Sequence, residues 1–128
     1  MRGPDRLAAW ADVEQTRQAL ACLARNAVEA APAGGWVRLT AEALPGGVEA
    51  LVEDSGPGPA ADQRPHLFDP FYSGRSAGRG KGLGLPVAWR LARQQGGAVR
   101  LEPPRPGQPT RFVLSLPRPD APEGRHAA

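Results

Sequence analysis

The sequence predicts an α+β fold, a two-layer sandwich in which helices cover one face of a mostly antiparallel mixed sheet. Helical patterns are expected over about residues 12–31 and 86–95, and each precedes two segments in which apolar and polar residues alternate. Turns rich in Pro and Gly join the two segments of each pair, which is typical of hairpins. Hairpins build an antiparallel sheet, and the helices then cover its apolar face.

The first helix is expected from Asp12 to about Ala31. Asp12, with Gln15 three residues later, resembles a capping box at the helix start, and Pro32 ends the helix. The expected apolar stripe consists of Leu20, Leu23, Ala24, Ala27 and Val28. An adjoining stripe consists of Cys22, Asn26 and Glu29 or Ala30.

The first hairpin joins a strand from Trp36 to Leu44 with a strand from Val48 to Asp54. Val48, Ala50, Val52 and Asp54 share one face of the second strand, so an apolar face ends in a carboxylate. A buried carboxylate needs a donor, and the two glycines at 56 and 58 let another group approach. We interpret this as a carboxylate kept to bind a ligand; the alternative is an aspartate that starts a surface turn.

The second half begins with a long loop, residues 55–83, which is unusual in a compact domain and typical of a functional segment. Within it, residues 65–72 are locally apolar and are expected to pack down as an anchor. Pro86 occupies the expected first position of the second helix, which Gly96 and Gly97 end. The second hairpin joins strands at Ala98–Glu102 and Thr110–Leu116. One face of the last strand carries Thr110, Phe112, Leu114 and Leu116.

A glycine-rich basic segment, residues 78–86, opens the second helix. Its backbone N–H groups, the helix N-terminus and Lys81 together favour phosphate binding. The segment is not a P-loop, because Arg75 stands where that motif needs Gly and Gly82 follows Lys81. It is not a Rossmann turn, because no strand leads directly into it. The alternative is a flexible glycine loop without a ligand.

Asn26 is a second candidate, because its amide oxygen can bind a cation and Mg²⁺ often takes few protein oxygens beside substrate phosphates. The alternative is an asparagine that is solvated or satisfied in the core. Cys22, one turn earlier, is expected to be a small buried apolar residue. His66 and His126 lack the spacing of metal ligands.

Composition limits the organisation and the partners. At 128 residues the chain is expected to hold one domain at 12–117, after a segment 1–11 that could be a truncated leading strand, and before a disordered tail at 118–128. A net charge of +3 is compatible with nucleic acid, but the arginines are spread and aromatics are only 5%, and a phosphate-bearing small ligand explains the charge as well, so no nucleic-acid partner is expected. One cysteine and no membrane segment or signal peptide favour a cytoplasmic location.

Taken together, these segments resemble the ATP-binding catalytic domain of a bacterial sensor histidine kinase, in the GHKL ATPase superfamily. Its four sequence boxes occur in the family's order, and the match spans about residues 12–117. The N box resembles Cys22–Ala30, the G1 box Asp54–Gly58, the F box Leu67–Phe71 and the G2 box Gly80–Leu85. Thr110-Arg111-Phe112 is similar to the family's closing Thr-x-Phe strand.

The resemblance implies a role for each matching residue in binding ATP and Mg²⁺. Asp54 would accept the adenine amino group, Asn26 would bind Mg²⁺ and Thr110 would support the adenine end. The glycines Gly56 and Gly58 would shape the adenine pocket. The phosphates would bind backbone N–H groups of Gly80, Gly82, Leu83, Gly84 and Leu85, with Lys81 beside them. Residues 57–81 would form the ATP lid, with Phe68 and Phe71 as its anchor.

The resemblance implies a kinase catalytic domain that donates the γ-phosphate of ATP to a histidine on a separate or missing dimerisation domain, in a phosphorelay with a response regulator. Two departures from the family pattern are Cys22, where kinases usually have Asn, and Pro109, where Gly is usual. No phosphoacceptor helix precedes residue 12, so the chain alone is not expected to autophosphorylate. Two alternatives stay open: a serine kinase of the anti-sigma-factor type and a nucleotide-binding pseudokinase module.

Overall fold

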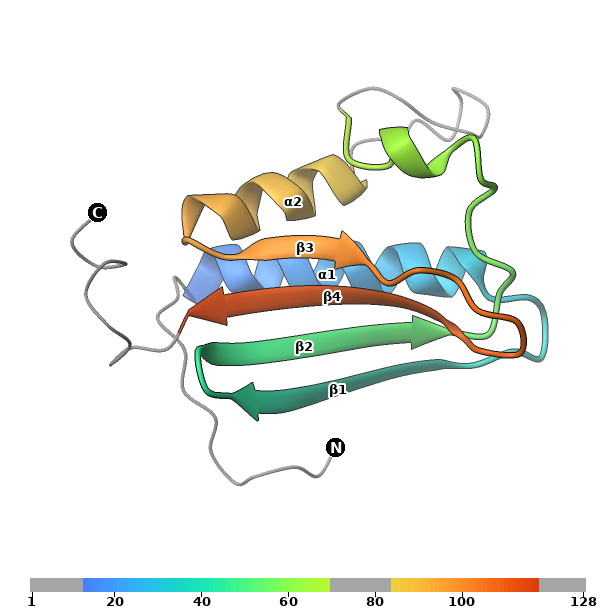
Figure 1. Cartoon of the computed structure of the whole chain (residues 1–128), viewed down its shortest axis with the longest axis horizontal. Coiled ribbons are helices and arrows are strands. Elements are labelled where there is room, and N and C mark those ends of the chain that lie inside the picture. Colours follow the sequence, from blue (N-terminus) through green and yellow to red (C-terminus); the bar gives the residue numbers. More distant parts are fainter. Residues whose placement is uncertain (1–12, 70–83, 118–128) are drawn as a thin grey trace.

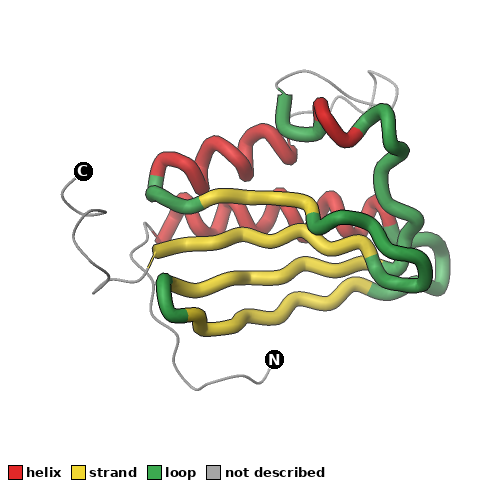
Figure 2. The backbone as a smooth tube through the Cα atoms, in the orientation of Figure 1, coloured by secondary structure: helices red, strands yellow, loops and turns green. Residues whose placement is uncertain are grey.

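The computed structural model describes residues 13–69 and 84–117, and these form the predicted α+β sandwich (Figures 1 and 2). The helices are α1 (Val13–Ala30), the short 3₁₀ helix η1 (Arg64–His66) and α2 (Gly84–Gln94). The strands are β1 (Val37–Leu44), β2 (Gly47–Asp54), β3 (Ala98–Leu101) and β4 (Thr110–Pro117). They form one sheet in the order β1-β2-β4-β3, and each described pair of neighbours is antiparallel.

The core lies between the sheet and the two long helices, which cover one face while the other face stays open (Figure 1). Leu23 of α1, Val52 of β2 and Phe112 of β4 are almost completely buried there. The inward face predicted for β2 is confirmed, because Val52 is paired with Phe112, and Asp54, two residues further on, with Thr110. Leu101 of β3, the cross-strand partner of Phe112, extends this row and also packs against the core.

The buried stripe of α1 differs from the expected one. Its centre consists of Ala19, Leu23 and Ala27, which follow one another at intervals of four residues and are at most 1% exposed. Val28 was expected in this stripe, but it is 64% exposed. Because each residue turns the helix by about 100°, Val28 lies well away from the line through Leu23 and Ala27.

The ends of α2 show why glycine and proline occur where they do. The helix begins at Gly84 and not, as expected, at Pro86, but Pro86 still lies in the first turn, where no helical N–H partner is needed. At the other end Gly96 has a φ of +82°. Its N–H donates to the Arg93 carbonyl and that of Gly97 donates to the Ala92 carbonyl, which is a Schellman ending. The predicted end of this helix is confirmed.

The edge strand β1 is only partly covered. Val37 packs against the core, but Leu39, two residues later on the same face, is 43% exposed. Of the apolar residues that alternate along this strand, Val37 and Ala41 are half-buried, whereas Leu39 and Ala43 are exposed, so the helices cover this edge of the sheet only in part. None of the described helices is long and apolar enough to cross a membrane.

Candidate functional site

Four chain segments that the sequence singled out meet at one end of the sandwich. The C-terminal ends of α1 and β2 and the N-terminal ends of α2 and β4 all lie at this end (Figure 1). Asn26, Asp54, Gly84 and Thr110 belong to these segments. The fold therefore brings parts of the N, G1 and G2 boxes and the start of the Thr-x-Phe strand to the same end of the molecule.

Asp54 is the most unusual residue of this site. It is 0% exposed, and its Oδ1 atom accepts a hydrogen bond of 2.7 Å from the backbone N–H of Gly56. Its Oδ2 atom is buried and has no hydrogen-bond partner within the described part of the chain. Burial raises the pKa of Asp54 above its ordinary value, and the Gly56 hydrogen bond offsets only part of this. A buried acceptor of this kind is costly unless a ligand supplies a donor.

Gly56 allows the turn after β2 to pass very close to α1. A Cβ atom at this position would collide with the carbonyl oxygen of Ala30 and would come within 2.9 Å of Asp54 Oδ1. Gly58 has a φ of +80°, and a Cβ there would lie 2.9 Å from Thr110 Oγ1. Both glycines are therefore required by the local geometry, as the predicted close approach of other groups implied.

Thr110 holds this turn from the neighbouring strand. It is the cross-strand partner of Asp54, and its hydroxyl donates a hydrogen bond of 3.2 Å to the Gly56 carbonyl. The side of the turn toward β1 is held by Ser55, whose N–H donates to the Trp36 carbonyl and whose hydroxyl accepts from the Trp36 N–H. The sequence did not indicate this role of Ser55; a serine directly after a strand-ending aspartate was the available signal.

Phe68 connects the following loop to the core. Its ring packs edge-on against Phe112, with centroids 6.4 Å apart and an angle of 89° between the planes. Leu67 also packs against the core, so the described part of the expected anchor packs down at Leu67 and Phe68, whereas Pro65, His66 and Asp69 are exposed. Phe71, the second proposed anchor, lies outside the described residues, and the role of both as a lid anchor stays a prediction.

Asn26 and Cys22 are both half-buried and lie one turn apart on α1. Cys22 packs against the core, as expected of a small apolar residue. Burial raises the pKa of its thiol, and the charge of Arg25 offsets only part of this, so the thiol is neutral at pH 7. A neutral thiol is a poor ligand for Mg²⁺, whereas the amide oxygen of Asn26 is of the type that Mg²⁺ prefers.

The G2 segment is described only at its end. Gly84 is the first residue of α2, and Leu85 packs against the core; Gly80, Lys81, Gly82 and Leu83 lie outside the described residues. The first turn of α2 holds no acidic residue. No carboxylate in this turn therefore neutralises the positive end of the helix dipole or repels a phosphate.

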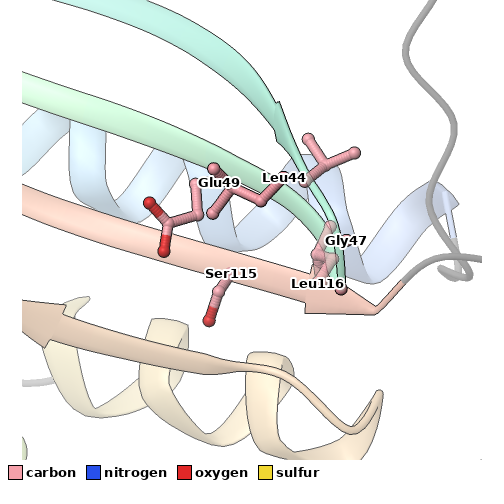
Figure 3. A pocket seen from close by; sticks show the side chains of 7 residues that line it. Leu44, Gly47, Glu49, Ser115 and Leu116 are labelled. Atoms are coloured by element: carbon pink, nitrogen blue, oxygen red, sulfur yellow. The ribbon is translucent and has the colours of Figure 1, made fainter. Parts of the chain in front are cut away.

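A small hollow of about 120 Å³ lies at the opposite end of the sheet, beside the β1–β2 turn (Figure 3). It is lined by Leu44, Gly46, Gly47, Val48, Glu49, Ser115 and Leu116. It contains none of the residues that the sequence predicted for ligand binding. We therefore place the functional site around Asp54 and not in this hollow.

Comparisons with known proteins show the family to which the chain belongs. Residues 11–120 match the family of histidine kinase-, DNA gyrase B- and HSP90-like ATPases. The chain is 36% identical to the sensor histidine kinase ZraS of Escherichia coli O157:H7 over 107 residues, which are 84% of this chain and 23% of ZraS. It thus spans less than a quarter of the length of that relative.

Solved structures that resemble the chain include histidine kinases. The mycobacterial sensor histidine kinase MprB superposes with a TM-score of 0.75 at 28% identity, over 86% of this chain and 76% of that one. Full-length ShkA in complex with AMPPNP superposes with a TM-score of 0.73 at 38% identity, over 88% of this chain and 23% of that one. The chain belongs to the histidine kinase-, DNA gyrase B- and HSP90-like ATPase family, and its relatives are sensor histidine kinases.

Proposed function

We propose that this chain binds Mg-ATP as the catalytic domain of a sensor histidine kinase, and that the adenine amino group donates to Asp54 Oδ2. The observation that carries the proposal is the buried Oδ2 atom, which has no partner among the described residues while Oδ1 is held by Gly56. An exocyclic amino group supplies the missing donor, whereas the carbonyl of guanine at the same ring position would face the carboxylate as a second acceptor.

The metal would be held mainly by the nucleotide. Asn26 offers one half-buried amide oxygen, and Mg²⁺ is commonly bound by one or two protein oxygens together with phosphate oxygens and waters. The amide oxygen of Asn26 is chemically suited to such an ion. When bound, Mg²⁺ would neutralise phosphate charge; Asn26 would orient it, and the N-terminal end of α2 would attract the phosphates.

The phosphoryl acceptor is proposed to be a histidine on a dimerisation domain, with a response regulator as the next partner. The sensor histidine kinase relatives support this proposal, and the chain spans less than a quarter of ZraS. Phosphoryl transfer is mainly a matter of positioning and charge stabilisation, so the catalytic domain contributes bound ATP and the acceptor comes from elsewhere.

A second candidate, a nucleotide-binding pseudokinase, is favoured by one observation. Cys22 stands where kinases usually have Asn, and its thiol is neutral because burial raises its pKa. Such a protein would keep the adenine contact of Asp54 and would bind nucleotide without needing the metal.

Calorimetric titration with ATP and GTP, with and without Mg²⁺, tests these proposals together. The kinase proposal predicts that ATP binds, that GTP does not, and that removal of Mg²⁺ weakens ATP binding at least tenfold, or about 1.4 kcal/mol. Equal ATP affinity with and without Mg²⁺ would favour the pseudokinase. Equal affinity for ATP and GTP would contradict the role of Asp54.

A further inference from the structure

We propose that Glu53 is a positioning residue for the nucleotide site: its clamp between Arg38 and Arg111, on the open face of the sheet, keeps Asp54 and Thr110 aimed into the site on the other face. The inference rests on the proposed binding of ATP. It concerns a residue whose side chain does not itself reach the site, because neighbouring residues of a strand point to opposite faces.

Glu53 is buried although it lies on the open face of the sheet. It is only 4% exposed, and both of its carboxylate oxygens are occupied. Oε1 accepts from Arg38 Nε at 2.9 Å. Oε2 accepts from Arg111 Nε at 2.9 Å and faces Arg111 Nη2 at 2.7 Å. One carboxylate therefore ties β2 to the strands on both of its sides.

The clamp lies in the row of residues next to the site. Arg38, Glu53 and Arg111 are direct cross-strand partners, and the next row consists of Val37, Asp54 and Thr110. A slip of either pairing by one residue would turn Asp54 or Thr110 to the wrong face. The clamp opposes such a slip at the two pairings that bring Asp54 and Thr110 together.

Arg38 extends the clamp to the turn that carries Gly56. Its guanidinium lies 4.8 Å from the centre of the Trp36 ring. The backbone of Trp36 forms two hydrogen bonds with Ser55, one through its carbonyl and one through its N–H. Both flanks of the Asp54–Gly56 turn are therefore connected to Glu53, one through Arg38 and one through the Arg111–Thr110 segment.

Glu53 is ionised in the folded protein. Burial alone would raise its pKa, but the hydrogen bonds and charges of Arg38 and Arg111 outweigh burial and hold the pKa below its ordinary value. The clamp is therefore intact at neutral pH, where ATP would be bound.

A purely stabilising ion pair is the simplest competing explanation, and the chain offers a matched control. Glu49 lies on the same strand and the same open face, with its side chain 17% exposed and 3.3 Å from Arg100. It is paired with Ser115, far along the strand from Asp54. Glu49→Gln makes the same chemical change away from the site.

The test compares ATP with inosine triphosphate, which has a carbonyl where adenine has its amino group, in the parent, Glu53→Gln and Glu49→Gln. Affinities are measured well below each unfolding midpoint, so that a loss of stability alone leaves them unchanged. We expect Glu53→Gln to weaken ATP binding about tenfold, as is typical when a residue that orients a ligand-binding group is changed. The ratio of ATP affinity to inosine triphosphate affinity should also fall. Glu49→Gln should stay within about twofold of the parent, because a distant pair does not couple to the site.

Two outcomes would overturn this inference. ATP affinity of Glu53→Gln within twofold of the parent would overturn it, and so would an equal loss for both nucleotides. If Glu53→Gln does not fold, Arg38→Gln, which leaves the Arg111 contact in place, decides by the same criteria. If the parent protein does not bind ATP, the proposed function itself is wrong. That result differs from one in which the parent binds ATP and Glu53→Gln binds it with the same affinity, which contradicts only the role of Glu53.

Discussion

At the scale of single residues, the nucleotide-free protein carries a cost at Asp54. A carboxylate that is 0% exposed keeps one oxygen without a described partner, and its pKa is raised by burial. Functional sites commonly retain groups that lower stability until the ligand is bound. Asp54 fits this pattern, because the buried oxygen without a described partner is the one proposed to accept from adenine.

The first prediction is that Asp54→Asn stabilises the nucleotide-free protein while it abolishes selective ATP binding. The amide oxygen can still accept from Gly56, and the buried charge is removed, so unfolding free energy at pH 7 should rise by about 1 kcal/mol. The free energy of ATP binding should weaken by about 1.5–3 kcal/mol, which is the contribution of a charge-assisted hydrogen bond. Urea unfolding and calorimetry measure the two effects. A variant that is less stable and binds ATP as tightly as the parent would contradict both.

The second prediction gives the pH dependence of the same substitution. Because the folded pKa of Asp54 is raised above its ordinary value of 3.8, the folded protein takes up a proton more readily than the unfolded chain. The cost of burying the ionised Asp54 carboxylate in the parent protein falls as the pH is lowered and the carboxylate takes up a proton. The stability gain of Asp54→Asn over the parent should therefore shrink between about pH 7 and pH 4. Glu53, whose pKa is lowered, acts in the opposite direction, but it is present in both proteins. A gain that stays constant with pH would contradict a raised pKa.

The third prediction concerns Gly56. Gly56→Ala would place a Cβ atom against the Ala30 carbonyl, so the turn must move away from α1. We expect a loss of about 1–3 kcal/mol in unfolding free energy, as for overpacking elsewhere, and weaker ATP binding. Gly46→Ala is the control, because a Cβ there meets nothing within 4 Å. Equal effects of the two substitutions on ATP affinity would show that the close approach of Gly56 is not needed.

At the scale of elements, local patterns were enough to predict the two long helices and the four strands of the described part of the chain, with ends within two residues. The inward face of β2 and the glycine ending of α2 followed from the residues themselves. The buried stripe of α1 followed only in part. Leu23 and Ala27 are buried as expected, but Ala19 was not assigned to the stripe and Val28 is exposed, because alanines at 19, 24 and 27 make several stripes equally apolar and only packing selects among them. Val28 was assigned to the wrong face for this reason.

The same limit applies to parts of the site. Glu53 alternates out of the core, so the sequence alone indicates a solvated residue. Its partners come from strands 15 and 58 residues away, and the pairing of β2 with β4 cannot be read from local pattern. The hydrogen bond of Ser55 could not be predicted either, because its partner, Trp36, is 19 residues earlier in the sequence. Contacts between distant strands, rather than residue types, complete the support of Asp54.

The fourth prediction is made for the loop after β2. Phe68→Ala removes the edge-on contact with Phe112 and leaves a gap at a half-buried position. We expect unfolding free energy to fall by about 1–3 kcal/mol, less than for a fully buried phenylalanine. Leu44→Ala, at a residue 40% exposed beside the β1–β2 turn, should cost less. A Phe68 variant as stable as the parent would mean that the ring does not hold the loop on the core.

At the scale of the whole molecule, binding and transfer are expected to be separable. The chain spans less than a quarter of the ZraS kinase that it resembles, and His66, the histidine in the described part, lies in a three-residue 3₁₀ helix beside Asp69. We predict that the chain alone binds Mg-ATP but gains no acid-labile label from γ-labelled ATP. Acid-labile label on His66 or His126 would contradict the separation of the catalytic domain from its acceptor.

The position of the adenine ring tests the central claim most directly. A crystal structure of the chain with Mg²⁺ and a non-hydrolysable ATP analogue should show the adenine amino nitrogen about 3 Å from Asp54 Oδ2, the usual length of such a hydrogen bond. Gly56 N–H should still donate to Oδ1, and the phosphates should lie toward the N-terminal end of α2. An adenine ring bound elsewhere, or a bound nucleotide that leaves Asp54 Oδ2 without a donor, would contradict the proposed site.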